Sequence, residues 1–208
     1  MFSAFLSYKR DADADADDWH KWSAEKMSSY LRTNTGAPGD INVFVDRKDI
    51  PNGSYWRKRL QRALHHSPIL IAFVSRAYFQ SPYCMAELQT FMDREDELLL
   101  ERGTLIHMAG IAKPSTFPGH ASEFQVENFQ PFYAPSESFS ETRTASDFSA
   151  ALNRFCQPIG EKLIHNGFPD HSDDFPILPI PDPPPEPAGT SRWGPLDPIM
   201  QPFSAAPA

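Results

Sequence analysis

The strongest constraint on the fold of this chain is a stretch of seven consecutive apolar residues. Residues 68–74 read Pro-Ile-Leu-Ile-Ala-Phe-Val. A strand with one face in water alternates apolar and polar residues, whereas a central strand of a parallel sheet is covered on both faces and is apolar throughout. The stretch therefore predicts a central parallel strand with helices on both sides of the sheet.

Strand and helix signals alternate along the first 165 residues. Besides the central strand, we predict strands at residues 2–7, 41–45 and 105–110, and a less sharply bounded one at 129–133. Apolar residues that recur every three or four positions predict the helices between and after the strands. The alternation predicts an α/β fold, a doubly wound, flavodoxin-like, five-stranded parallel sheet flanked by helices.

Capping residues predict where two of the helices begin. Asp17 or Asp18 can cap the first helix, because an aspartate accepts hydrogen bonds from the unpaired N–H groups of a first turn. Ser81 followed by Pro82 predicts the start of the third helix, since serine is a good cap and proline suits the first helical position. Pro158, within the apolar stripe of the last helix, predicts a kink there.

Proline also marks the end of the folded domain. Twelve of the 21 prolines follow Lys162, and residues 179–187 read Pro-Ile-Pro-Asp-Pro-Pro-Pro-Glu-Pro. Such a run cannot be helical and lacks the N–H donors of a central strand. We therefore divide the chain into a domain at residues 1–165 and a Pro-rich tail at 166–208. The tail is either disordered or, because it also carries large apolar side chains, a segment that docks on its own domain or on a partner.

Composition argues against several classes of protein. The formal net charge of −8 disfavours binding of nucleic acid through a basic surface. No apolar run approaches the roughly 20 residues of a membrane-spanning helix, and the first residues do not resemble a signal peptide. Two cysteines, Cys84 and Cys156, are too few for a disulfide framework or a metal cage of their own. We expect a cytoplasmic protein that contacts neither a membrane nor nucleic acid directly.

Two patterns resemble metal sites only weakly. The Asp-Ala run at residues 11–18 lacks the glycine turn and the spaced ligands of a cation loop, so a solvated loop is its simpler interpretation. His65 and His66 end a helix, where positive charge is favourable without any ligand role. We therefore assign no metal ligand.

Three segments resemble the sequence boxes of Toll/interleukin-1 receptor (TIR) domains. Residues 5–10, Phe-Leu-Ser-Tyr-Lys-Arg, resemble the first box at the end of the first strand. Residues 43–46, with the turn-rich loop up to Gly53, are similar to the second strand and the BB loop. Residues 75–88 resemble the third helix with its entry loop. The boxes occur in order on the expected elements, span roughly residues 2–165 and are most similar to bacterial TIR domains.

The resemblance implies one of two functions, because TIR domains are either scaffolds or enzymes that break the nicotinamide–ribose bond of NAD+. The enzymes depend on a glutamate in an aromatic-x-x-x-Glu motif of the third helix, which corresponds here to Tyr83 and Glu87. This spacing places the two side chains on one helix face. Tyrosine stands where many active relatives have tryptophan, and it offers a smaller face for stacking. We predict that Glu87 is catalytic; a solvated helix glutamate is the simpler alternative.

The resemblance also implies which residues bind the substrate. These residues are Phe5, Ser7, Tyr8, Lys9, Arg10, Asp46, Asp49 and Tyr83. The first three would line the ribose or the nicotinamide, and the two basic residues would face the diphosphate unless they are simply an exposed pair. The two aspartates flank the BB loop, which completes the site of a neighbouring subunit in active relatives and is otherwise a plain turn. Cys84 is expected on the buried helix face, as a core residue.

The main prediction is an NAD+ glycohydrolase or cyclase that takes NAD+ as substrate, needs no cofactor and yields ADP-ribose or a cyclic isomer. The resemblance implies self-association through TIR–TIR contacts, a possible separate sensor or effector protein, and a role in bacterial anti-phage defence or signalling. The alternative is a non-catalytic adaptor that acts by homotypic contacts. A phosphorelay receiver domain is rejected, because it needs acidic residues after the first strand and an aspartate at the end of the third, where this chain has Ser7-Tyr8-Lys9-Arg10 and Ser75-Arg76.

Overall fold

The computed structural model describes residues 3–9, 14–35, 43–45, 56–136 and 138–164. Within these ranges five strands form one sheet: Ala4–Tyr8 (β1), Val43–Val45 (β2), Leu70–Val74 (β3), Ile106–Gly110 (β4) and Val126–Asn128 (β5). Their order is β2-β1-β3-β4-β5, and all neighbouring strands are parallel. This is the flavodoxin-like order of a doubly wound sheet, so the predicted fold class is confirmed.

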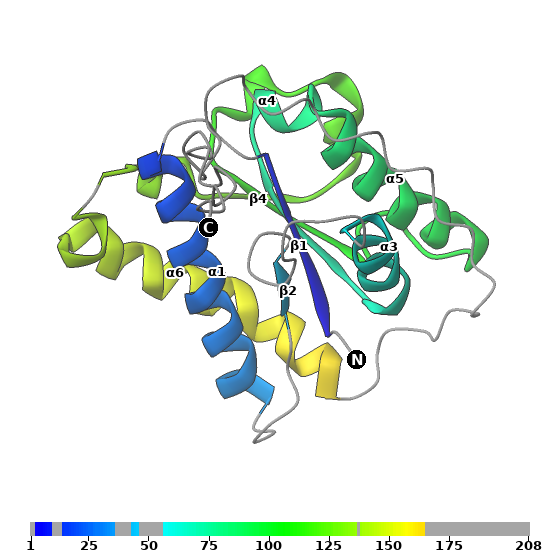
Figure 1. Cartoon of the computed structure of the whole chain (residues 1–208), viewed down its shortest axis with the longest axis horizontal. Coiled ribbons are helices and arrows are strands. Elements are labelled where there is room, and N and C mark those ends of the chain that lie inside the picture. Colours follow the sequence, from blue (N-terminus) through cyan, green and yellow to red (C-terminus); the bar gives the residue numbers. More distant parts are fainter. Residues whose placement is uncertain (1–2, 10–13, 36–42, 46–55, 137, 165–208) are drawn as a thin grey trace, which may run out of the picture.

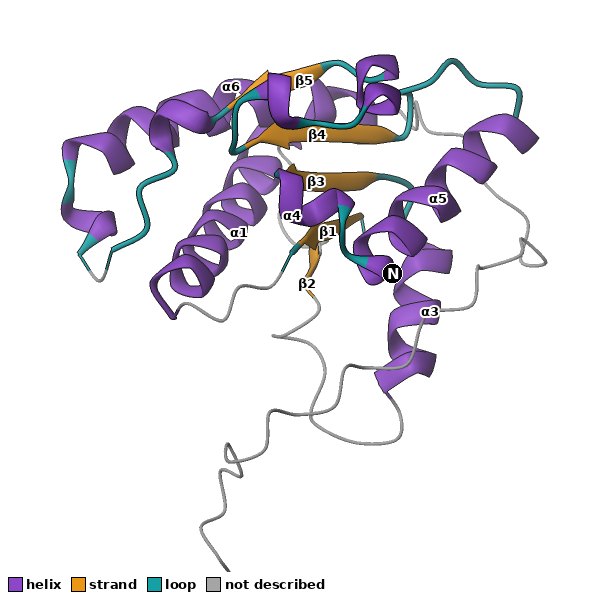
Figure 2. Cartoon of the chain, turned by 90° about the horizontal axis from the view of Figure 1, so that it is seen from above, coloured by secondary structure: helices purple, strands orange, loops and turns teal. Residues whose placement is uncertain are grey.

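Helices cover both faces of the sheet. The described α-helices are Ala14–Thr35 (α1), Trp56–His66 (α3), Arg76–Phe79 (α4), Pro82–Glu97 (α5) and Arg143–Ile164 (α6). Short 3₁₀ helices occur at Pro114–Thr116 (η1), Gly119–Glu123 (η2), Gln130–Phe132 (η3) and Phe139–Glu141 (η4). Helices α1 and α6 pack together on one side of the sheet, and α3 and α5 lie on the other side (Figure 1). Figure 2 shows this order across the sheet, with β5 at one edge and β2, beside β1, at the other.

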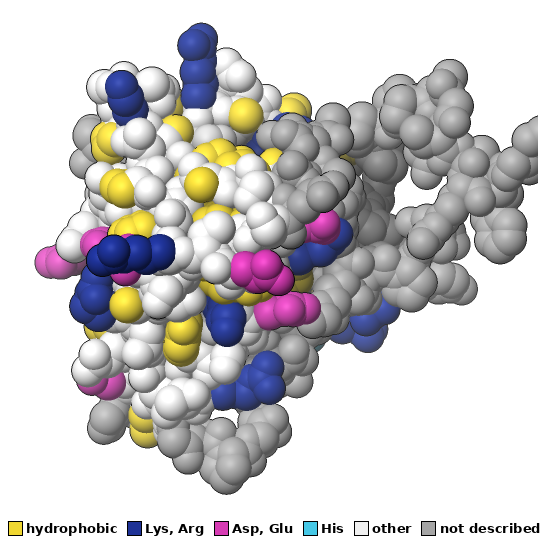
Figure 3. Space-filling view, turned by 90° about the vertical axis from the view of Figure 1, so that its left-hand side faces the viewer, with side chains coloured by type: hydrophobic (Ala, Val, Ile, Leu, Met, Phe, Trp, Pro, Cys, Tyr) yellow, Lys and Arg dark blue, Asp and Glu magenta, His cyan; other side chains and the backbone are white. Residues whose placement is uncertain are grey.

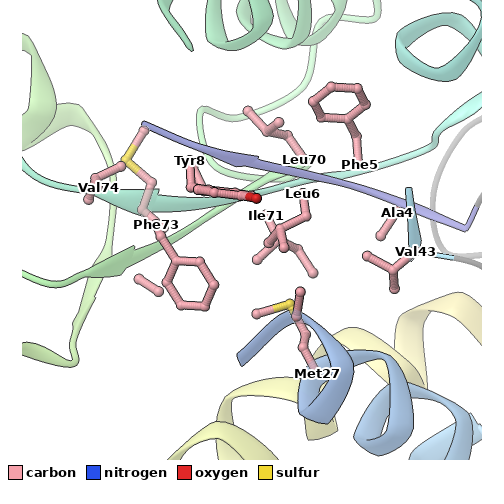
Figure 4. Packing of buried hydrophobic residues seen from close by; sticks show 14 of the residues in the cluster. Ala4, Phe5, Leu6, Tyr8, Met27, Val43, Leu70, Ile71, Phe73 and Val74 are labelled. Atoms are coloured by element: carbon pink, nitrogen blue, oxygen red, sulfur yellow. The ribbon is translucent and has the colours of Figure 1, made fainter. Parts of the chain in front are cut away.

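The two faces of β1 bury different side chains, because successive residues of a strand point to opposite sides. Leu6, like its neighbour Ile71 on β3, points toward Met27 of α1, whereas Phe5 points away from that helix (Figure 4). Ser7 therefore shares the side of Phe5, under α5, and Tyr8 shares the side of Leu6. These four residues of β1 are all buried.

An aromatic cluster fills the space between the sheet and the helices α1 and α6. Trp19 of α1 is its centre and contacts the rings of Phe73, Tyr133 and Phe148 at centroid distances of 5.5, 4.9 and 5.1 Å. Edge-on and tilted contacts of this kind add to the stabilisation that burial of the rings provides. The cluster joins β3, α1 and α6 into one core.

The fifth strand lies at residues 126–128, so the prediction of a strand at 129–133 is wrong. Phe129 is fully buried with its ring 5.4 Å from that of Phe148, and residues 130–132 form the 3₁₀ helix η3, which contains Pro131. The aromatic residues that suggested a strand belong instead to the core beneath α6. Proline at position 131 suits a helical turn and not a sheet ladder.

Helix α1 begins at Ala14, so the prediction that Asp17 or Asp18 caps it is also wrong. Both aspartates lie inside the helix, near its start. Alanine has the highest helix propensity, and acidic side chains are favourable near a helix N-terminus, so the second half of the Asp-Ala run is helical. Pro158 lies within α6, which continues to Ile164. The predicted tail at residues 166–208 lies outside the described residues.

Candidate active site

Two short sequence signals place the helix that carries Glu87. Ser75 caps α4 by accepting a hydrogen bond from the backbone N–H of Tyr78 (3.2 Å). Ser81 caps α5 by accepting one from the N–H of Cys84 (3.4 Å), and Pro82 occupies the first helical position, as predicted. The two caps bring the start of α5 over the carboxyl end of β1, where doubly wound folds bind ligands.

Glu87 lies in the second turn of α5, and its side chain is buried. The residue is 6% exposed, so it is not the solvated helix glutamate of the simpler interpretation. Ser7 donates a hydrogen bond from its Oγ to Oε2 of Glu87, at 2.5 Å. A buried carboxylate is costly unless it is hydrogen-bonded, and a hydroxyl donor to a charged acceptor gives a short, strong bond.

Tyr78 continues this contact into the protein. Its hydroxyl oxygen lies 3.0 Å from Oγ of Ser7. A serine hydroxyl has a single hydrogen, and that of Ser7 is donated to Glu87, so the Tyr78 hydroxyl is the donor to Ser7. The Tyr78 hydroxyl also lies 3.4 Å from the carbonyl oxygen of Cys84, which competes for the same hydrogen. The result is a buried chain of hydrogen bonds from Tyr78 through Ser7 to Glu87.

Tyr78 and its neighbour Cys84 are both neutral at physiological pH. Burial, followed by the negative charges that Cys84 and Glu87 can carry, raises the pKa of Tyr78 well above 10.0. Burial and then the charge of Glu87 raise the pKa of the Cys84 thiol from 9.0 to about 12. Cys84 is therefore a buried thiol, as expected of a core residue. A thiol is a much poorer nucleophile than a thiolate.

Two other predicted site residues lie beside Glu87 or near it. Tyr83 is half-buried and lies one turn before Glu87 on α5. Lys9 follows β1 and is exposed, and its positive charge opposes the effects of burial and of Glu87 on the pKa of Cys84. The structure thus brings together Ser7, Glu87 and Tyr83, with Lys9 at the rim.

Phe5 and Tyr8 each stack on another buried aromatic ring. Phe5 is 0% exposed and stacks on Phe44 of β2, with ring centroids 5.2 Å apart. Tyr8 lies on the opposite side of the sheet, where its ring stacks on that of His20 at 4.7 Å. In this arrangement both rings belong to the core. Arg10, Asp46 and Asp49, the remaining predicted substrate contacts, lie outside the described residues.

Tyr78 is the residue of the site that sequence reasoning missed. It was part of the third TIR-like segment, but no role followed from its neighbours in the sequence. The signal that could have found it is a tyrosine placed between two capping serines, directly before the helix of Glu87. A buried tyrosine in such a place needs a partner for its hydroxyl.

The central group of the site is the buried carboxyl group of Glu87, which the hydrogen bond from Ser7 fixes in place. Among the residues that the structure describes, no group of three or more His, Cys, Asp or Glu side chains is placed to hold a metal ion. No helix in the described ranges is both long and apolar enough to cross a membrane. On the face shown in Figure 3, the apolar side chains form several separate groups between polar and charged ones. A buried carboxylate near a helix start is suited to stabilising positive charge on a bound molecule.

Comparison with known proteins identifies the fold family. Residues 5–124, more than half of the chain, match the sequence model of a family described as TIR domain. The matched region contains β1 from Phe5 onward, the site residues that the structure describes, and α5. No curated protein matches the chain.

Proposed function

The chain belongs to the TIR domain family, and on that basis we propose that it is an NAD+ nucleosidase, which cleaves the bond between nicotinamide and ribose. The observation that carries the proposal is the buried carboxylate of Glu87, held by Ser7 at the carboxyl end of β1. Glu87 occupies the position that the family resemblance assigns to the catalytic glutamate. Tyr83, one turn earlier, is available to stack on the nicotinamide ring.

A single carboxylate is enough for this reaction. Hydrolysis of an ordinary glycoside needs a second carboxyl group to protonate the departing oxygen. The nicotinamide of NAD+ is a pyridinium cation, so it leaves as a neutral molecule when it takes the bonding electron pair, without a proton. The remaining task is to stabilise the positive charge that develops on the ribose.

Burial strengthens that stabilisation. Coulomb attraction between a carboxylate and a ribosyl cation is several times stronger in a protein interior than in water. A carboxylate held in place by a hydrogen bond also needs no reorganisation during the reaction. Attack of water on the ribosyl cation gives ADP-ribose, and attack by a group of the same molecule gives a cyclic isomer.

The family resemblance supports the setting of this activity. We propose that the protein acts in the cytoplasm, in bacterial anti-phage defence or signalling, and that copies associate through TIR–TIR contacts. A separate sensor or effector protein would supply the trigger or receive the product.

The proposal is tested by incubating the purified protein with NAD+ and separating the products by chromatography. Wild type should release nicotinamide. Glu87→Gln should lower turnover by about 10²- to 10³-fold, the scale of losing one preorganised electrostatic group. Glutamine removes the charge but keeps a carbonyl oxygen that can accept the hydrogen bond from Ser7.

Glu97→Gln is the matched control, because it is the same chemical change on the same helix at an exposed position. It should retain the wild-type rate. Equal turnover in wild type and Glu87→Gln would refute the assignment of Glu87. A wild type that binds its own copies but releases no nicotinamide would favour the non-catalytic adaptor.

A further inference from the structure

The part of the site that the proposed reaction leaves without a role is the pair of hydroxyl groups behind Glu87. Ser7 is 1% exposed and Tyr78 is 0% exposed, so neither presents a surface to a bound molecule. Yet their oxygens lie 3.0 Å apart, and Ser7 reaches Oε2 of Glu87 at 2.5 Å. The three residues come from β1, α4 and α5, which are separate elements.

The direction of the hydrogen bonds is set by the number of hydrogens. A carboxylate can only accept, a serine hydroxyl donates one hydrogen, and a tyrosine hydroxyl donates one. Ser7 donates its hydrogen to Glu87, so in its contact with Tyr78 it can only accept, and it shares the one Tyr78 hydrogen with the carbonyl oxygen of Cys84. Burial keeps the Tyr78 hydroxyl protonated, because it raises the pKa of that group well above 10.0. The Tyr78 hydroxyl, which begins this series of hydrogen bonds, therefore keeps its hydrogen at physiological pH.

The hydrogen bonds from Tyr78 through Ser7 fix the Glu87 carboxyl group from within the protein interior. Ser7 is held on the central sheet, and Tyr78 is held by α4, which the side chain of Ser75 caps. Hydrogen bonds of this kind restrict a side chain to one orientation. A carboxylate that rotates freely would spend part of its time misdirected.

We propose that Ser7 and Tyr78 are positioning residues, which orient the Glu87 carboxylate toward the ribose and do not touch the substrate. This inference rests on the proposed cleavage of NAD+. It differs from the expectation drawn from the resemblance, in which Ser7 lines the ribose or the nicotinamide. It also gives a role to Tyr78, which had none.

The test uses Tyr78→Phe, which removes one oxygen and keeps the buried ring, together with Ser7→Ala and the double variant. Each single variant should lower kcat by about 10- to 100-fold, because a displacement of about 1 Å at the reacting group costs on that scale. KM for NAD+ should stay within about twofold of wild type. In the Ser7→Ala background, Tyr78→Phe should cause no further loss, because its effect passes through Ser7.

Tyr30→Phe and Ser28→Ala are the matched controls, since both lie on α1, on the other side of the sheet. Both should retain wild-type kcat and KM. A rise in KM with unchanged kcat in Ser7→Ala would overturn the proposal and show that Ser7 binds the substrate. Independent, multiplicative losses of kcat in the double variant would overturn the link between Tyr78 and Ser7, and so would an unchanged kcat in Tyr78→Phe.

Melting temperatures of wild type, Ser7→Ala, Tyr78→Phe and the double variant separate this inference from the proposed function. The shifts of the two single variants should not add in the double variant, whether or not NAD+ is cleaved, because the two hydroxyls share one hydrogen bond. If the shifts in melting temperature are not additive but the protein does not cleave NAD+, the proposed function is refuted. The hydrogen bonds among Tyr78, Ser7 and Glu87 would then have no catalytic role. Additive shifts in an active enzyme would refute only the positioning role.

Discussion

Burial determines the protonation state of several single residues in this protein. Beside Glu87 it keeps Tyr78 of α4 and Cys84 of α5 neutral, because it raises the pKa of both groups. On β4 it acts on a base: burial, together with the positive charge of Lys162 on α6, lowers the pKa of His107 from 6.5 to about 4. A buried imidazole is thus kept neutral in the folded state.

The lowered pKa of His107 predicts a loss of stability in mild acid. The unfolded chain binds a proton at this histidine near pH 6.5, whereas the folded protein does so only near pH 4. The contribution of His107 is therefore fully present above pH 6.5 and is lost as the pH falls toward 4. Between pH 7.5 and 4.5, His107→Gln should lose about 2–3 kcal/mol less unfolding free energy than wild type, by denaturant titration. Equal losses of unfolding free energy in the two proteins would contradict the lowered pKa of His107.

Helix α5 is held at its far end by two buried charged residues. Arg94 donates hydrogen bonds to the carbonyl oxygens of Ser67 (2.7 Å) and Leu64 (2.9 Å), and so satisfies the carboxyl end of α3. Glu95 is 0% exposed and accepts from the backbone N–H groups of Gly103 (3.1 Å) and Leu105 (2.7 Å), just before β4. The helix that carries Glu87 is thereby fixed to α3 and β4 as well as to β1.

The anchor at Glu95 leads to a prediction about stability. Glu95→Gln replaces one acceptor oxygen by an N–H₂ group that faces backbone donors, and it weakens the contact with Arg102 (3.3 Å). The unfolding free energy should fall by about 3 kcal/mol, as expected when buried donors lose their partner. Asp96→Asn is the control: Asp96 also pairs with Arg102 (2.7 Å), but its side chain is 63% exposed, so the loss should be under about 1 kcal/mol. Chemical denaturation of both variants measures the difference, and similar losses would show that Glu95 is no anchor.

The folded unit extends beyond the region that matches the TIR family. The match ends at residue 124, whereas β5 and α6 follow it and complete the sheet and its helical cover. The ring of Phe148 on α6 packs against Trp19 on α1, with centroids 5.1 Å apart. The last described element, α6, ends at Ile164, and the predicted tail beyond the boundary at residue 165 lies outside the described residues.

We therefore predict that truncation after Phe168 leaves a folded domain that still cleaves NAD+. The removed segment cannot extend the sheet, since its prolines lack the N–H donors that a ladder requires. Differential scanning calorimetry should show one cooperative transition in the truncated protein, and its specific activity should equal that of the full chain. An insoluble product, or one without a cooperative transition, would place the tail in the core and move the domain boundary.

Local patterns were enough for several features of this protein. The apolar run at residues 68–74 indicated the central strand, and Ser81 with Pro82 indicated the start of α5, because burial on both faces and capping leave marks on adjacent residues. Alternation of strands and helices indicated the doubly wound sheet, and the resemblance of residues 75–88 to a TIR segment singled out Glu87 as the candidate glutamate. These inferences depend on neighbours a few positions apart.

Only the tertiary structure decided how the site is assembled. Ser7 is 80 residues from Glu87 and 71 from Tyr78, and their contact follows from the packing of α4 and α5 over β1. Alternation along a strand predicts two faces, but it does not say which helix covers each one. The resemblance implied one site for Ser7 and Tyr8, whereas the structure places them on opposite sides of the sheet. Phe129 was mistaken for strand because an aromatic residue looks the same whether it pairs in a sheet or fills a core. Its place beneath α6 depends on residues that are distant in the chain and adjacent only after folding.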